Sequence, residues 1–111
     1  MQKIQGKNIL LVGATGGIGS ETARLLKNSG ANLWITSTRP ENLRSLGESL
    51  GIPENQRFSM DVRSFPEVEK VSAAIHAQIP FVDIIINAAG IGIIKPMEST
   101  RNFKIIITKI I

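Results

Sequence analysis

The chain has 111 residues, of which 42% are hydrophobic and 20% charged, and its formal net charge is +4. This length allows one small domain with a single core, and the composition is typical of a globular protein. The 13 Lys and Arg are scattered along the chain, and four Phe and one Trp are the only aromatic residues, so we expect no nucleic-acid partner. Cysteine is absent, which excludes disulfides and thiolate metal sites, and no metal-binding residue is assigned.

The apolar segments of the sequence are short. Residues 9–12 form a run too short for a secretory signal, and residues 84–94 contain Asn87 and fall well below the ~18 residues of a membrane helix. We therefore expect a soluble, cytoplasmic chain with no membrane partner.

The first half of the chain alternates between strand and helix patterns. The apolar run 8–12 predicts a strand. A helix is expected over residues 17–29, with Ile18, Thr22, Leu25 and Leu26 on one stripe and Gly30 at its C-terminal end. Residues 32–36 predict a second, buried strand. A second helix follows, with Thr38 as its cap, Pro40 in its first turn and Gly51 at its end.

The second half continues the alternation. Residues 56–60 predict a third strand. Ser64-Phe-Pro-Glu67 matches a capping box, in which the Ser hydroxyl accepts from the backbone near Glu67 and the Glu reaches back. The helix that follows has Val68, Val71, Ile75 and Ile79 on one face, and residues 81–86 predict a fourth strand that is covered on both sides.

Four strands interleaved with helices indicate an α/β fold. Such units form a parallel, Rossmann-type sheet with helices on both faces, and we expect the strand order 3-2-1-4, with the fold ending after about four strands.

A glycine-rich turn with the spacing Gly13-x-x-x-Gly17-x-Gly19 joins the first strand to the first helix. Glycine lets the backbone approach phosphate oxygens, while the free N–H groups and the dipole of the helix favour an anion. A Walker loop is excluded because no Lys occurs between Lys7 and Lys27. The turn therefore predicts a dinucleotide site.

Three motifs in the right order resemble the short-chain dehydrogenase/reductase family. The glycine motif of that family, Thr-Gly-x-x-x-Gly-x-Gly, is matched by residues 12–19 with Val12 in place of Thr. Its Asn-Asn-Ala-Gly motif is similar to residues 87–90, with Ala88 in place of the second Asn, and its adenine-binding Asp corresponds to Asp61. The resemblance covers residues 7 to about 98 and is greatest to 3-oxoacyl-acyl-carrier-protein reductase-like members.

The glycine turn, the end of the second strand and the resemblance together give a set of expected cofactor-binding residues. These are Gly13, Thr15, Gly16, Gly17, Ile18, Gly19, Ser37, Thr38, Arg39, Asp61, Val62, Asn87, Ala88, Ala89 and Gly90.

The end of the second strand favours NADP over NAD. An NAD site usually has an acid about 20 residues beyond the glycines, whereas an Arg there suits a 2′-phosphate. Residues 36–39 read Thr-Ser-Thr-Arg, with no acid before Glu41. The alternative is that Arg39 is a solvated turn residue.

The family's chemistry is hydride transfer between nicotinamide and a carbonyl or alcohol, with a Tyr, a Lys and a Ser at the reacting centre. This chain contains no Tyr, so no catalytic residue is assigned and we expect the chain alone to be inactive. An alternative is a non-catalytic nucleotide-binding or interaction module. A methyltransferase-type Rossmann domain is disfavoured by the two further family motifs.

The resemblance fades near residue 99. We expect residues 1–98 to be the dinucleotide-binding half of a Rossmann-type domain and 99–111 to be an atypical Ile-rich tail. Our hypothesis is that the chain is the N-terminal part of a longer reductase, ended by truncation or a shifted reading frame. The fourth strand would then expose an apolar edge, from which we expect self-association.

Overall fold

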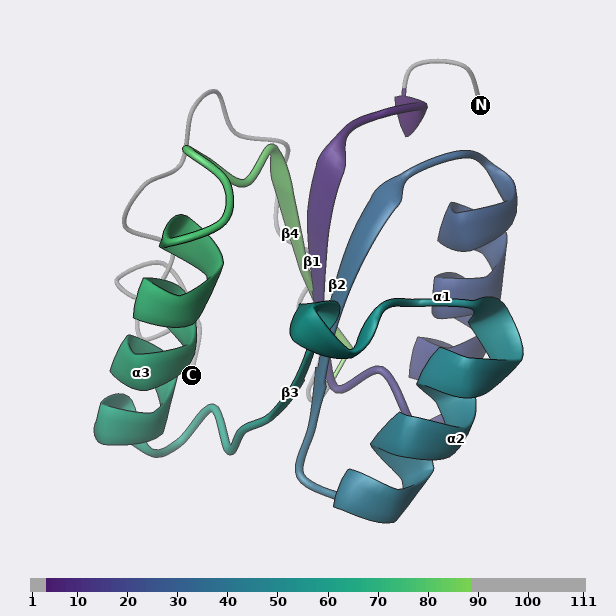
Figure 1. Cartoon of the computed structure of the whole chain (residues 1–111). Coiled ribbons are helices and arrows are strands. Elements are labelled where there is room, and N and C mark those ends of the chain that lie inside the picture. Colours follow the sequence, from purple (N-terminus) through teal and green to yellow (C-terminus); the bar gives the residue numbers. More distant parts are fainter. Residues whose placement is uncertain (1–3, 89–111) are drawn as a thin grey trace.

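The computed structural model describes residues 4–88, which form a single parallel sheet covered by helices (Figure 1). The elements in chain order are β1 (Asn8–Val12), α1 (Gly17–Asn28), β2 (Asn32–Ser37), α2 (Pro40–Leu50), the short 3-10 helix η2 (Glu54–Gln56), β3 (Arg57–Ser59), α3 (Phe65–His76) and β4 (Ile84–Asn87). The strand order is β3-β2-β1-β4, with every pair parallel. The predicted Rossmann-type sheet and its order are confirmed.

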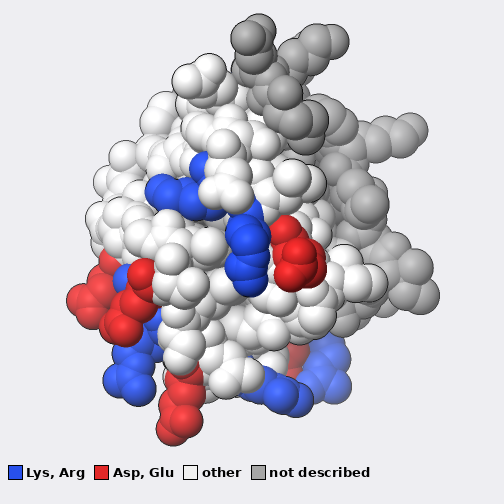
Figure 2. Space-filling model, turned by 90° about the vertical axis from the view of Figure 1, so that its right-hand side faces the viewer, with Lys and Arg blue, Asp and Glu red and all other residues white. Residues whose placement is uncertain are grey.

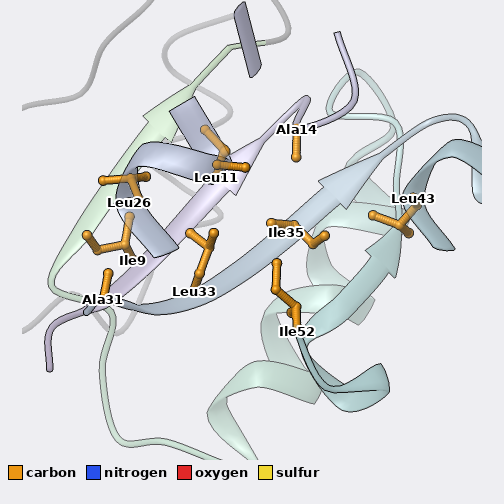
Figure 3. Close-up of a cluster of buried hydrophobic side chains, with 10 residues drawn as sticks. Ile9, Leu11, Ala14, Leu26, Ala31, Leu33, Ile35, Leu43 and Ile52 are labelled. Carbon is orange, nitrogen blue, oxygen red and sulfur yellow. The ribbon is translucent and has the colours of Figure 1, made fainter. Parts of the chain in front are cut away.

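Alternate residues of the strands enter two separate cores. On one face, side chains of β1 and β2 pack beneath α1 and α2 (Figure 3); they include Ile9, Leu11, Leu33 and Ile35. On the other face, Leu10, Val12 and Trp34 pack against α3. Both faces of β1 are therefore buried, which explains its continuous apolar sequence.

Of the stripe expected for α1, Leu26 is buried as predicted, but Ile18 and Leu25 are not. The buried residues are Gly19, Ala23 and Leu26, whereas Ile18 is 79% exposed and Leu25 57% exposed. Small side chains let the helix lie close to the sheet, so the buried face follows Gly19 and Ala23 rather than the largest apolar residues.

The start of α2 also corrects a prediction. The cap is Arg39 rather than Thr38, and the side chain of Arg39 makes no capping hydrogen bond. The hydroxyl that acts here belongs to Ser37, whose Oγ accepts a hydrogen bond from Arg39 N at 3.0 Å. At the other end, Gly51 adopts the left-handed conformation expected of a C-terminal glycine, with φ 69°.

The capping box at α3 forms only in part. Ser64 caps the helix and its Oγ accepts from Glu67 N at 3.4 Å. The carboxylate of Glu67, however, accepts from Asp61 N at 3.0 Å instead of from the backbone of Ser64. The N–H of Ser64 donates to Asp61 O, which leaves it unavailable for Glu67.

Three strands differ in extent from their predicted ranges. β2 runs to Ser37, one residue beyond the predicted range 32–36. β3 covers residues 57–59 rather than 56–60, because Gln56 ends the preceding 3-10 helix, and β4 covers residues 84–87 rather than 81–86. The predictions for Ala89, Gly90 and residues 99–111 lie outside the described residues. Within residues 4–88, no helix has the length and apolarity needed to span a bilayer.

Three side-chain amides form a ladder across the amino ends of the strands. Asn32 Nδ2 donates to Asn8 Oδ1 at 2.7 Å, and Gln56 Nε2 donates to Asn32 Oδ1 at 3.0 Å. Asn8 is also tied to the segment before β4, since its N–H donates to Asp83 Oδ2 at 2.8 Å. The ladder thus joins the starts of three strands at the end of the sheet opposite to the glycine turn.

Candidate functional site

The turn after β1 is built on a backbone conformation that favours glycine. Gly13 has φ 76°, in the left-handed region. Its N–H and that of Ala14 both donate to the carbonyl of Thr36, at 3.0 and 2.9 Å. The end of β1 and the end of β2 are thereby locked together at the carboxyl edge of the sheet.

The glycines of the turn have different roles. A β-carbon on Gly19 would overlap the carbonyl oxygen of Gly13, so only glycine allows α1 to start this close to the turn. Gly16 and Gly17, by contrast, face open space, with nothing within 4 Å of an added β-carbon. This is the arrangement in which one glycine permits close helix packing and others leave room for a phosphate.

The N-terminus of α1 has no side-chain cap and no acidic residue in its first turn. Among the α-helices of residues 4–88, α2 and α3 each have an acid in the first turn, Glu41 and Glu67. The first N–H groups of a helix have no partner within the helix and carry a partial positive charge. The start of α1 can therefore hold an anion such as a pyrophosphate.

Hydroxyl groups from two elements meet beside this helix start. Thr15 Oγ1 and Ser37 Oγ are 2.6 Å apart, and Ser37 Oγ also accepts from Arg39 N. When two hydroxyls hydrogen-bond to each other, one of the two O–H groups donates within the pair. The other O–H group can then donate to a further acceptor. Thr38 and Arg39 are exposed next to this pair.

The end of β3 lies next to the end of β2. Met60 N donates to Ser37 O at 2.9 Å, which brings the following residue, Asp61, to the same edge of the sheet. Val62 is partly buried against the core on the α3 side. The end of β4 completes the edge, because Asn87 pairs in register with Val12 and Ala88 N donates to Val12 O at 2.8 Å.

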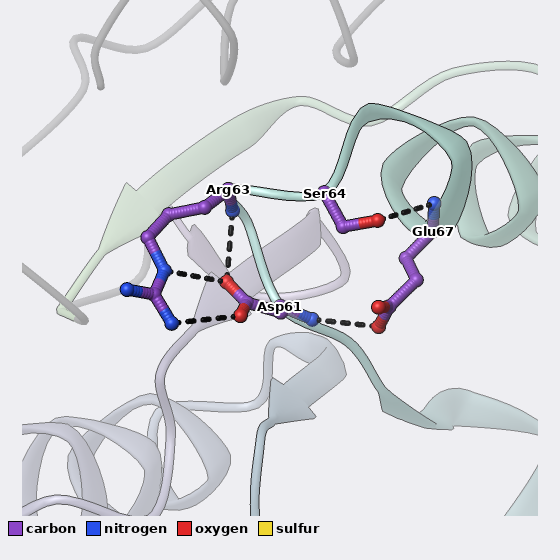
Figure 4. Close-up of polar contacts among 4 residues, drawn as sticks. All are labelled: Asp61, Arg63, Ser64 and Glu67. Atoms are coloured by element: carbon purple, nitrogen blue, oxygen red, sulfur yellow. Dashed lines mark hydrogen bonds and ion pairs between the residues drawn. The ribbon is translucent and has the colours of Figure 1, made fainter.

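The carboxylate of Asp61 forms an ion pair with Arg63 at 2.9 Å (Figure 4). The side-chain hydrogen bond from Arg63 holds the pKa of Asp61 below its ordinary value, and the N–H of Arg63 acts in the same direction. Asp61 is therefore an ionised acceptor at neutral pH.

Most of the expected site residues described by the structure gather at the carboxyl edge of the sheet or at the start of α1. Ile18, the second residue of α1, is exposed there. Sequence reasoning missed the contributions of Arg63 and Glu67. The signal available for Arg63 was its position two residues after Asp61, where a basic side chain can turn back onto a carboxylate.

Charge on the face covered by α1 and α2 is mixed. Figure 2 shows basic and acidic residues interspersed there, without a continuous basic field.

Comparison with known proteins connects this geometry to a family. A family model described as short chain dehydrogenase matches residues 7–108, beyond residue 98 where the motif resemblance ends. Members of the family use nicotinamide dinucleotides.

Curated relatives include several enzymes. Nodulation protein G of Rhizobium sp. (strain N33) is 35% identical over 91 residues, covering 82% of this chain and 37% of that protein. The 3-oxoacyl-acyl-carrier-protein reductase FabG of Rickettsia felis is 34% identical over 91 residues, covering 82% of this chain and 36% of the relative. The NADP-dependent 3-hydroxy acid dehydrogenase YdfG of Salmonella typhi is 34% identical over 86 residues, covering 77% of this chain and 34% of that protein.

Solved structures agree with the fold. A short-chain dehydrogenase/reductase from Brucella melitensis, described as glucose/ribitol dehydrogenase, aligns with TM-score 0.64 and 32% identity over 74% of this chain and 35% of its own. A short chain dehydrogenase from Shigella flexneri, at 23% identity, shares the fold with TM-score 0.73 over 82% of this chain and 42% of its own. The chain spans little more than a third of the length of the curated relatives described above. With the matched family model, these similarities show that the chain belongs to the short-chain dehydrogenase family.

Proposed function

We propose that this chain binds NADP and is the dinucleotide-binding portion, residues 1–98, of a short-chain dehydrogenase. The reaction would be hydride transfer between nicotinamide and a carbonyl or alcohol. The observation that carries the proposal is the uncapped start of α1, which lies beside Gly13 at the carboxyl edge of the sheet and has no acidic residue in its first turn. In open α/β sheets, ligands bind at this edge.

The proposal assigns a role to each part of this edge. The N–H groups at the start of α1 hold the pyrophosphate, with Gly16 and Gly17 leaving room for it. Asp61 accepts a hydrogen bond from the adenine amino group, and Val62 contacts the base. Asn87 and Ala88, at the end of β4, approach the nicotinamide side of the cofactor, and the sequence motif assigns Ala89 and Gly90 to the same site. The cofactor, when bound, supplies the hydride.

NADP is preferred to NAD in this proposal because of the groups at the end of β2. Arg39 is exposed, and no carboxylate occurs between Thr36 and Glu41. A guanidinium can pair with a 2′-phosphate, and the free O–H of the Thr15–Ser37 pair can donate to it. A carboxylate at this position, as in many NAD sites, would repel the phosphate instead.

A charge placed at the start of α1 tests the phosphate site. Gly17→Asp should weaken NADPH binding, because the new carboxylate competes with the pyrophosphate. The same change should leave the helix intact or stabilise it by about 0.3–1 kcal/mol through the helix dipole. Asn28→Asp adds an equal charge at the other end of α1 and serves as the matched control. Equal NADPH affinities for the two variants, by isothermal titration calorimetry, would refute the site.

A charge reversal at Arg39 tests the cofactor preference. The chain should bind NADPH at least tenfold more tightly than NADH, since a hydrogen bond to a charged group contributes about 1.5–3 kcal/mol. Arg39→Asp should remove this preference. Arg44→Asp, at an exposed position on α2, makes the same change of charge and should keep it. Equal affinities of the unmodified chain for the two cofactors would leave dinucleotide binding intact and contradict the choice of NADP.

A further inference from the structure

Arg63 contacts the carboxylate of Asp61 through three donors. Its Nε donates to Oδ1 at 3.1 Å, its Nη2 to Oδ2 at 2.9 Å, and its backbone N–H to Oδ1 at 2.9 Å (Figure 4). The two side-chain bonds form a bidentate pair, whose planar geometry fixes the orientation of a carboxylate as well as its charge. The carboxylate of Asp61 is thus oriented by Arg63, two residues later in the sequence.

The backbone of Asp61 is held from the other side by the start of α3. Asp61 N donates to Glu67 Oε1 at 3.0 Å, and Ser64 N donates to Asp61 O at 2.9 Å. Glu67 is itself fixed at the helix start, because its N–H donates to Ser64 Oγ. Both the main chain and the side chain of Asp61 therefore have defined positions.

A count of acceptor positions shows what the carboxylate can still accept. An ionised carboxylate has about four lone-pair positions, two on each oxygen. Oδ1 accepts two hydrogen bonds from Arg63, and Oδ2 accepts one. One position remains, on Oδ2, and it can take one N–H donor. The side chain of Asp61 is 31% exposed, so a ligand can reach it.

We propose that Arg63 is a positioning residue that makes Asp61 selective for a base with an amino group at position 6, adenine, over one with a carbonyl there, hypoxanthine. This inference rests on the proposed function. The amino group of adenine donates to the remaining position on Oδ2, whereas the carbonyl oxygen of hypoxanthine would face a second acceptor. Without Arg63 the carboxylate can rotate, so the two bases are distinguished less well.

The size of the effect is limited by the exposure of Arg63. Its side chain is 79% exposed, and solvent screens such a pair. We expect the chain to bind NADPH about tenfold more tightly than its hypoxanthine analogue, and Arg63→Ala to reduce this ratio about threefold or more. Arg63→Lys keeps the charge but not the bidentate geometry. Its ratio of NADPH affinity to analogue affinity should therefore fall between those of the unmodified chain and Arg63→Ala.

The experiment compares the two cofactor analogues on the complete 111-residue chain by calorimetry. Arg24→Ala, which removes an exposed Arg from α1, is the matched control and should keep the ratio of the unmodified chain. A purely structural role for Arg63 would lower both affinities together and leave their ratio unchanged, and that result would overturn the inference.

A measurement without ligand tests the ion pair itself. The side-chain carboxyl carbon of Asp61, followed by NMR against pH, should titrate at a higher pH in Arg63→Ala than in the unmodified chain. Identical midpoints would overturn the inference. If the unmodified chain binds both analogues equally, the inference fails while dinucleotide binding stands. If it binds neither, the proposed function fails and the inference with it.

Discussion

The carbonyl oxygen of Gly13 occupies the space that a β-carbon on Gly19 would need. This contact joins the turn after β1 to the second residue beyond the start of α1, and it sets how close the helix start lies to the sheet. The position of the proposed phosphate site therefore depends on the absence of one side chain.

Gly19→Ala should destabilise the chain by about 1–3 kcal/mol, because a backbone atom has to move to make room. Urea denaturation followed by circular dichroism would measure the change. Gly17→Ala is the matched control, since a β-carbon there meets nothing within 4 Å. Its stability should be unchanged or up to about 1 kcal/mol greater through helix propensity. Equal stabilities of the two variants would contradict the close packing of Gly19.

The hydroxyl of Thr36 is buried without a hydrogen-bond partner in the described part of the chain. Thr36→Val should therefore be neutral or stabilise the chain by about 1 kcal/mol, because an unpaired buried hydroxyl is unfavourable. Thr15→Val makes the same chemical change where the hydroxyl is paired with Ser37, and it should cost about 0.5–1.5 kcal/mol. Thermal unfolding of both variants gives the comparison, and a large loss of stability in Thr36→Val would show a partner for that hydroxyl.

Asn32 is the middle member of the amide ladder, so its removal affects both neighbours. Asn32→Ala leaves Asn8 Oδ1 without its donor and removes one acceptor of Gln56, which should cost about 1–3 kcal/mol. Asn42→Ala, at an exposed position on α2, is the control and should stay within about 0.5 kcal/mol. Similar unfolding midpoints in urea for the two variants would indicate that water replaces the ladder without cost.

The 111-residue chain should show no carbonyl reduction above background. It contains no Tyr, and without a positioned general acid the transfer of a proton to the substrate oxygen lacks its catalyst. The assay would follow the loss of NADPH absorbance with a ketone or a 3-oxoacyl thioester, with a full-length reductase as the positive control. Turnover by material free of host reductases would contradict this prediction.

We expect the chain to self-associate through β4. Among the described strands, β4 pairs with β1 alone, so its other edge has no neighbour in residues 4–88. An apolar edge strand of this kind pairs readily with another chain. Light scattering coupled to size-exclusion chromatography should show dimers or larger species that increase with concentration. A monomer that persists at high micromolar concentration would refute the prediction.

Much of the fold could be predicted from local sequence signals. The apolar run before Gly13 predicted β1, Gly51 predicted the end of α2, and Ser64 predicted the start of α3. The structure confirms all three predictions. The buried side of α1 could not be predicted, because Gly19 and Ala23 owe their burial to close contact with the sheet and not to their own hydrophobicity. The helical spacing of apolar residues gives most weight to large side chains, so it predicted Ile18 on the buried side of α1, whereas Ile18 is exposed.

The site was predictable where a backbone turn demands a residue type, as at Gly13. The site was not predictable where a side chain has several possible hydrogen-bond partners. Glu67 had two N–H groups within reach, and the bond from Ser64 N to Asp61 O left only that of Asp61. The ladder had an unused signal, because Asn8, Asn32 and Gln56 each lie at or just before the first residue of a strand. In this chain the three amides contact one another across neighbouring strands.

The members of the ladder are evenly spaced along the chain, 24 residues from Asn8 to Asn32 and 24 from Asn32 to Gln56. Closing a loop of twice that length costs only about 0.6 kcal/mol more. Chain entropy alone therefore hardly distinguishes β2 from β3 as the neighbour of β1 during folding. Which strand pairs with β1 therefore depends on side chains. Asn32 suits the middle position because its NH₂ group donates to Asn8 while its oxygen accepts from Gln56.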